Sequence, residues 1–198
     1  MAIKFQYNKT FLQQLNRELK VRVNALPTLI AKESALRVEV IKAKELVLQL
    51  EANIQKEMET LSDADRLWVE MSEGLVKVGK VAVIVKKIAG VKTPILEKVA
   101  FDIPRYSLVT QAAWIPDGIE ILKRIAELKI TLALAKKKVT ILEYARKKTT
   151  QKVNLYEKVQ IPEYKESVRK IKRFMEDEDN LAKSSQKILK VKLAAEAA

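Results

Sequence analysis

The stretch ILKRIAELKITLALAKKKVTIL, residues 121–142, places apolar side chains at alternating steps of four and three residues. These steps put the side chains on one narrow face of an α-helix, and such a face needs a partner helix. The register continues beyond this stretch through Arg146, Thr149, Val153 and Tyr156. The spacing predicts one arm of a coiled coil.

The same spacing recurs near the other end, in LRVEVIKAKELVLQLEANIQKEMETL, residues 36–61. We expect the chain to fold back on itself so that the two apolar faces pack against each other. We therefore predict a mainly α fold: a long antiparallel two-helix coiled coil of the N- and C-terminal arms, with a small central head that contains a β-hairpin. The expected seam residues are Val40, Val47, Leu50, Ile54, Ile125, Leu128, Leu132, Val139 and Leu142.

The middle of the chain has a different composition and divides it into three expected parts, residues 1–73, 74–116 and 117–198. The β-branched run at 81–85 predicts a strand, and a second extended run is expected at 95–103 after a bend at Ala89 and Gly90. A lone two-stranded hairpin is only marginally stable in water. We therefore expect the hairpin to lean on the helices or on a partner.

Candidate helix ends and interruptions come from the polar residues and the prolines. Asn8 or Thr10 is expected to cap the first helix and Asp117 the second. We expect Pro27 to kink the first helix without ending it, and Pro162 to kink or briefly break the second. Trp68 and Trp114 flank the insert and are expected to join a small core there, rather than to anchor an interface.

Charge is abundant and unevenly placed. The net charge is +13, yet residues 1–73 carry equal numbers of basic and acidic side chains, whereas residues 123–173 carry sixteen basic and five acidic ones. Such a surface is expected to meet nucleic acid, anionic lipid or an acidic protein wall. The candidate contact residues are Lys136, Lys137, Lys138, Arg146, Lys147, Lys148, Arg169 and Arg173.

Several kinds of chemistry find no support in the sequence. Histidine and cysteine are absent, which removes the commonest general base, the thiolate ligands and the histidine-dependent nucleophiles. The acidic run 176–179 points around most of a helix, so we interpret it as solvated rather than as a metal site. No apolar run is long enough to cross a membrane, and the N-terminus lacks a signal peptide. We expect a cytoplasmic protein without enzymatic activity, cofactor or metal.

Two stretches, IAGVKTP at 88–94 and TTQKVNLYEKVQIP at 149–162, resemble motifs of the family of V-type ATPase D subunits. The first resembles a turn in that family's head, and the second matches a pattern that ends in Val159, Ile161 and Pro162. The resemblance implies a non-catalytic central rotor shaft that couples ATP hydrolysis or synthesis to rotation and to proton or sodium transport.

The resemblance also implies partners and a place in the cell. The arms would insert into a hexamer of catalytic A and B subunits. The head would bind the F subunit and sit towards the C (or d) subunit at the membrane ring, through Ile88, Gly90, Val91, Pro94 and Ile95. The chain would be peripheral to the membrane as part of the complex, without entering the membrane or binding nucleic acid.

Two alternatives use the same basic surplus. One is a coiled coil that binds nucleic acid, although the lysines lack interleaved aromatic residues and no base-reading module is present. The other is a scaffold that tethers to anionic membrane. Gel shift and liposome flotation would distinguish these alternatives from a rotor shaft.

Overall fold

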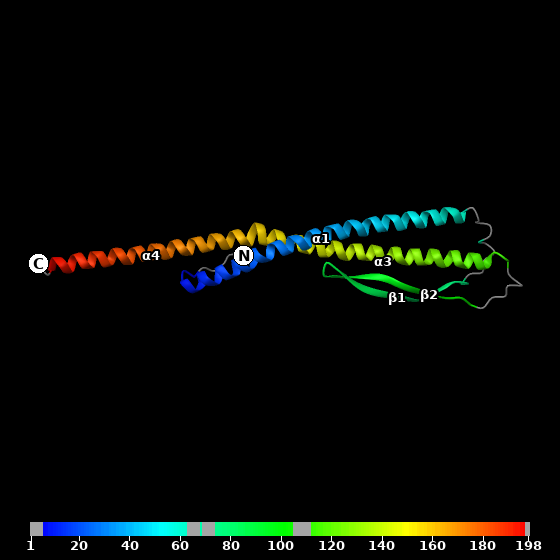
Figure 1. Cartoon of the computed structure of the whole chain (residues 1–198), viewed down its shortest axis with the longest axis horizontal. Helices are drawn as coiled ribbons and strands as arrows, with labels where there is room; N and C mark the ends of the chain where they lie inside the picture. The colour runs from blue at the N-terminus through cyan, green and yellow to red at the C-terminus, as the bar shows by residue number, and fades with distance from the viewer. Residues whose placement is uncertain (1–5, 63–67, 69–73, 105–111, 197–198) are drawn as a thin grey trace. The chain divides into compact units, whose positions relative to one another are not determined.

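The computed structural model describes residues 6–62, 68, 74–104 and 112–196. Its elements are helix α1 (Lys9–Ser62), strands β1 (Lys77–Ile88) and β2 (Val91–Asp102), helix α3 (Ile115–Asn154), the π-helical turn η1 (Leu155–Gln160) and helix α4 (Ile161–Glu196) (Figure 1). The predicted fold class is confirmed, since the chain forms two long helical arms with an antiparallel hairpin between them in the sequence. The chain divides into two compact units, residues 32–148 and residues 1–31 with 149–198, which are described in turn.

In the unit of residues 32–148, α1 and α3 run in opposite directions. Three ion pairs show this order: Glu57 with Arg124, Glu51 with Lys136 and Lys44 with Glu143, so that the residue number falls along α1 as it rises along α3. The side chains of all three pairs are at least partly exposed to solvent, where an ion pair contributes about 1 kcal/mol or less. They therefore mark the direction of pairing, and apolar burial supplies the stability.

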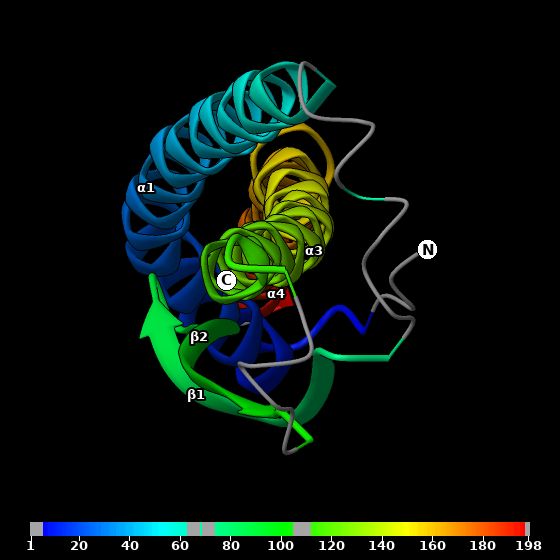
Figure 2. The same ribbon diagram turned by 90° about the vertical axis from the view of Figure 1, so that its right-hand side faces the viewer.

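The hairpin lies along α3, on the side away from α1 over most of its length (Figures 1 and 2). Its tip packs on a cluster of fully or nearly fully buried side chains, namely Leu36, Val40, Ala43 and Leu142. Its base joins a second cluster, formed by Leu75, Ile115 and Ile119. Both ends of the hairpin are thus fixed to the helices, as its marginal stability in isolation requires.

The two strands are longer than predicted and include Pro94. Ile88 pairs with Val91, and the two residues between them have positive φ, 48° at Ala89 and 79° at Gly90. Positive φ at both central residues is the geometry of a tight type I′ turn, which matches the twist of the strands. Pro94 pairs with Val85 inside β2, because a two-stranded sheet has only edge strands and can place the missing N–H outward.

The prediction for the start of the second helix was wrong. The helix begins at Ile115, so Asp117 lies in its first turn and does not cap it. Pro116 explains the difference, since the first helical turn needs no backbone donor at that position and tolerates proline. Trp114 approaches Trp68 edge to face, with ring centroids 5.4 Å apart, and packs against the cluster at the base of the hairpin. The predicted small core around the tryptophans is confirmed.

In the unit of residues 1–31 and 149–198, the first part of α1 runs antiparallel to η1 and α4. Asn8 caps α1, because its Oδ1 accepts the N–H of Phe11 at 2.7 Å. The helix then passes through Pro27 without ending, as predicted. The predicted interruption near Pro162 takes the form of the π turn that precedes it. Leu15 and Ile171 are the most deeply buried apolar side chains of this unit.

Candidate functional site

The nine residues expected on the seam are all buried or half-buried. In the unit of residues 32–148, Leu142 is fully buried, and Val40, Leu50 and Ile125 are nearly so. The remaining five, Val47, Ile54, Leu128, Leu132 and Val139, are half-buried. These residues therefore lie between the two arms, where the four most buried ones are out of reach of a partner.

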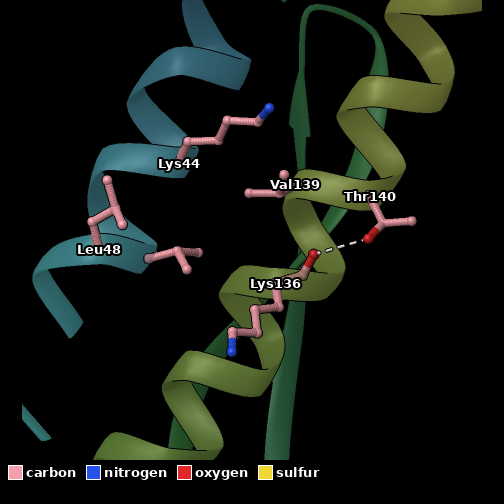
Figure 3. A pocket seen from close by; sticks show the side chains of 6 residues that line it. Lys44, Leu48, Lys136, Val139 and Thr140 are labelled. Atoms are coloured by element: carbon pink, nitrogen blue, oxygen red, sulfur yellow. Dashed lines mark hydrogen bonds between the residues drawn. The ribbon is translucent and has the colours of Figure 1, made fainter. Parts of the chain in front are cut away.

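A hollow of about 400 Å³ opens between α1 and α3 where the half-buried seam residues Val47 and Val139 lie (Figure 3). Leu48 and Thr140 complete its walls, and the aliphatic stems of Lys44 and Lys136 form its rim. The amine of each lysine forms an ion pair across the two helices, at 2.6 Å to Glu143 and 2.7 Å to Glu51. The lysines therefore act here as cross-links between the arms.

The eight predicted basic contact residues fall into two groups with different surroundings. Lys138 and Arg146 are half-buried, and Lys136 is committed to Glu51. The others are exposed: Lys137, Lys147 and Lys148, which we call the basic surface, lie in one unit, and Arg169 and Arg173 lie in the other. Lys148 lies over the ring of the exposed Tyr144, 5.6 Å from its centroid. Charges of this kind are the ones available to an acidic partner.

The predicted head residues are also divided. Val91 packs against the buried cluster of α1 and α3, and Ile88 and Pro94 are half-buried. Gly90 and Ile95 are exposed. Three apolar neighbours on β1 that were not predicted as contact residues, Val83, Ile84 and Val85, are between 42% and 59% exposed. Successive side chains of a strand point to opposite faces, so Val83 and Val85 share one face, which we call the apolar surface on β1, and Ile84 lies on the other. Their β-branched run predicted the strand, but nothing in the sequence showed which side would be covered.

A polar cluster around Arg22, in the unit that contains η1, was not predicted from the sequence. Arg22 Nε donates to Gln160 Oε1 at 3.0 Å, and its Nη1 donates to the Glu18 carbonyl oxygen at 3.0 Å. The guanidinium lies 4.3 Å from the centre of the Tyr164 ring, and the Tyr164 hydroxyl donates to Glu18 Oε2 at 2.6 Å. We call Glu18, Arg22, Gln160 and Tyr164 the Arg22 cluster.

The Arg22 cluster shifts two pKa values. The hydrogen bond from Tyr164 is the largest cause that lowers the pKa of Glu18, and a hydrogen bond from Gln14 and the charge of Arg22 add to it. Burial is the largest cause that raises the pKa of Tyr164, followed by its hydrogen bond to Glu18. The cluster therefore joins α1 to α4 most strongly when Glu18 is charged and Tyr164 is neutral.

Within the described ranges, no group of three or more acidic side chains is arranged to hold a metal ion. Among the same residues, no helix combines the length and apolar character needed to cross a bilayer.

The fold defines a class of protein in which two helical arms pair antiparallel and a hairpin is inserted between them in the sequence, with exposed basic and apolar side chains. The sequence matches, over residues 11–191, the family model that describes the D subunit of ATP synthase. The chain belongs to this family of ATP synthase D subunits.

Similar proteins match along nearly their whole length. The V-type ATP synthase D subunit of Borreliella burgdorferi is 32% identical over 192 residues, which cover 96% of this chain and 95% of the relative. The proteins of the same name in Chlamydia trachomatis serovar L2 and Chlamydia muridarum are 25% and 26% identical over 198 residues, with 98% of each chain covered. The shared length includes both arms and the hairpin.

Proposed function

We propose that this chain is the non-catalytic central rotor shaft of a V-type ATPase or ATP synthase. It would couple ATP hydrolysis or synthesis in a hexamer of A and B subunits to rotation and to proton or sodium transport. The observation that carries this proposal is the match of 32% identity over 95% of a relative named as the D subunit of a V-type ATP synthase. The organisation into an N-terminal arm (1–73), a central head (74–116) and a C-terminal arm (117–198) belongs to the same proposal.

The pairing of the arms supports a mechanical role. In each unit two helices run antiparallel, with apolar seam residues between them and polar cross-links beside the seam. Two helices locked along a seam resist twisting better than a single helix does. A shaft needs this property in order to transmit torque.

The basic surface supports an electrostatic contact with the hexamer. Attraction between exposed charges acts over about 10 Å at moderate salt and depends weakly on direction. A cationic shaft in an acidic sleeve could therefore be held without being trapped at one angle. The F subunit and the C (or d) subunit would meet the head, where Gly90, Ile95 and the apolar surface on β1 are exposed. The complex would lie in the cytoplasm, peripheral to the membrane.

The test of this function is binding to a reconstituted A and B hexamer as salt is varied. A variant with Lys137, Lys147, Lys148, Arg169 and Arg173 changed to Gln should bind at least about tenfold more weakly at low salt, with a smaller salt dependence. The matched control changes the exposed hairpin residues Lys86, Lys87 and Lys92 to Gln and should bind as the native chain does. Native affinity and salt dependence in the first variant would contradict the proposal.

A further inference from the structure

The π turn η1 coincides with a one-residue skip in the spacing of the seam. Up to Tyr156 the seam advances by four and three, and continued α winding would next place residues 160, 163, 167, 170 and 174 on it. Of these five positions only Ser167 is buried in the structure, which buries Ile161 and fully buries Ile171 in place of their neighbours at 160 and 170, while Lys170 is exposed and Phe174 is 44% exposed. The step from Tyr156 to Ile161 is therefore five residues, and the π turn absorbs the additional one.

Two local features stabilise this winding. The Ile161 N–H donates to the Tyr156 carbonyl oxygen, which is the five-residue hydrogen bond of a π-helix. Pro162 follows directly, and in continuous α winding its ring would crowd the carbonyl of Lys158. A wider turn at this place relieves the crowding.

One hydrogen bond of the Arg22 cluster depends on whether the turn has π or α winding. Arg22 Nε donates to the amide oxygen of Gln160, the last residue of η1. If the turn were α-helical, each residue after it would take the position that the next residue holds in the structure. Val159 would then face Arg22 in place of Gln160, and its side chain offers no acceptor. The hydrogen bond between Arg22 and Gln160 therefore favours the π winding specifically.

We propose that η1 is a register joint, a turn that passes between π and α winding and so exchanges which residues of α4 face α1. The native state is the π register, with Ile171 on the seam and Phe174 beside Tyr7, their ring centroids 4.6 Å apart. In the α register, Lys170 would replace Ile171 and Arg173 would replace Phe174. One residue corresponds to about 100° of rotation about the helix axis. In the proposed rotor shaft this rotation would turn α4 about its own axis against α1, a consequence that rests on the proposed function.

Cysteine pairs measure the register directly, because the native chain contains no cysteine. Tyr7→Cys with Phe174→Cys reports the π register, Tyr7→Cys with Arg173→Cys reports the α register, and Tyr7→Cys with Lys172→Cys is the background pair. Disulfide formation in the isolated chain should be fastest for the 174 pair, and the 173 pair should exceed the background. A 173 pair that reacts no faster than the background would overturn the joint.

Two changes move the equilibrium in opposite directions. Gln160→Ala removes the acceptor and should raise the rate of the 173 pair by about tenfold, whereas the control Gln151→Ala, at an exposed site on α3, should not change it. Deleting the exposed Val159 removes the skipped residue and should abolish the 173 signal while the 174 pair still forms. If the Tyr7→Cys and Arg173→Cys pair formed its disulfide at equal rates in Gln160→Ala and Gln151→Ala, the proposal of a register joint would be contradicted. This holds even if the deletion variant failed to fold.

These readouts separate the joint from the proposed function, because they use the isolated chain. A register shift in a chain that fails to bind the hexamer would contradict the rotor assignment and support the joint. Hexamer binding with no register shift would support the assignment and overturn the joint.

Discussion

Ala89 occupies a backbone conformation that L-residues with a side chain seldom adopt. Its φ of 48° lies in the left-handed region, which costs about 1–2 kcal/mol for a residue with a Cβ. Gly90, the other turn residue, has φ 79° and avoids this cost because it has no Cβ. The turn therefore retains strain at one of its two central positions.

Ala89→Gly should raise the free energy of unfolding by about 1 kcal/mol, because glycine adopts this φ without the steric cost. Urea unfolding measures the change. The matched control is Ala52→Gly, at an exposed site inside α1, which should lower stability by about 0.5–1 kcal/mol because glycine weakens a helix. A loss of stability in Ala89→Gly would contradict the type I′ turn.

Gly118 lies where a side chain has no room. A Cβ there would be 2.7 Å from Trp114 Cζ3. Gly118→Ala should therefore lower the free energy of unfolding by about 1–3 kcal/mol, although alanine is the better helix former. Glu120→Ala, at an exposed site in the same turn, is the control and should change stability by less than about 0.5 kcal/mol. Increased stability of Gly118→Ala in thermal or urea unfolding would show that Trp114 does not pack there.

The Arg22 cluster gives the stability of its unit a dependence on pH. Because the pKa of Glu18 is lowered in the folded state, its contribution is present above its ordinary value of 4.5 and is lost as pH falls through the lowered value. Because the pKa of Tyr164 is raised, its contribution is present below 10.0 and is lost as pH rises through the raised value. Tyr164→Phe removes the hydroxyl group that is responsible for both pKa effects.

Tyr164→Phe should flatten the pH dependence of unfolding at both ends of this range, and its NMR titration should show the pKa of Glu18 closer to 4.5. Tyr144→Phe is the matched control, since Tyr144 is exposed and lies in the other unit. An unchanged Glu18 titration in Tyr164→Phe would contradict the hydrogen bond.

At the scale of single residues, local chemistry was predictable and long-range polar contacts were not. Asn8 and Thr10 were the two predicted caps of α1, from their side chains and their place before an apolar pattern, and Asn8 is the one that caps it. Arg22, Gln160 and Tyr164 meet across 138 or more residues of sequence, and no periodicity indicates which polar side chains on a seam will pair. The start of α3 was misplaced because Asp117 and Pro116 both suit a first helical turn.

At the scale of elements, periodicity predicted the helices well and their local winding less well. Heptad spacing predicted two arms, and the β-branched run predicted the hairpin. The π turn was missed because the interruption was attributed to Pro162 alone, as a kink or a brief break. The apolar residues near the end of α4 do not continue the packed face, since Leu181 and Ile188 are 69% and 59% exposed.

The final part of α4 should contribute little to the stability of its unit. Every residue of α4 from Glu176 to Ala195 is exposed. Truncation after Met175 should therefore change the free energy of unfolding by less than about 1 kcal/mol, because almost no packed apolar surface is lost. Truncation after Ser167 is the control and should destabilise the unit strongly, since it also removes the buried Ile171. Equal effects of the two truncations, measured by circular dichroism, would contradict this assignment.

At the scale of the whole molecule, the sequence predicted the fold class and the family, and the structure changed the expectations for the surfaces. Of the predicted basic residues, Lys136 is used within the chain, and of the head residues Val91 packs inward. Composition reports how much charge is present, but burial and pairing decide which charges a partner can reach. The basic surface and the exposed residues of β1 therefore replace the longer predicted sets as targets for mutation.

Single-molecule rotation tests the rotor assignment most directly. A probe is attached to Lys87→Cys, the only cysteine of the chain, on an exposed part of the hairpin, and the A and B hexamer is fixed to a surface. A rotor shaft predicts that the probe turns in one direction while ATP is present and stops when ATP is removed. A hexamer that binds the chain and hydrolyses ATP while the probe stays at a fixed angle would contradict the assignment.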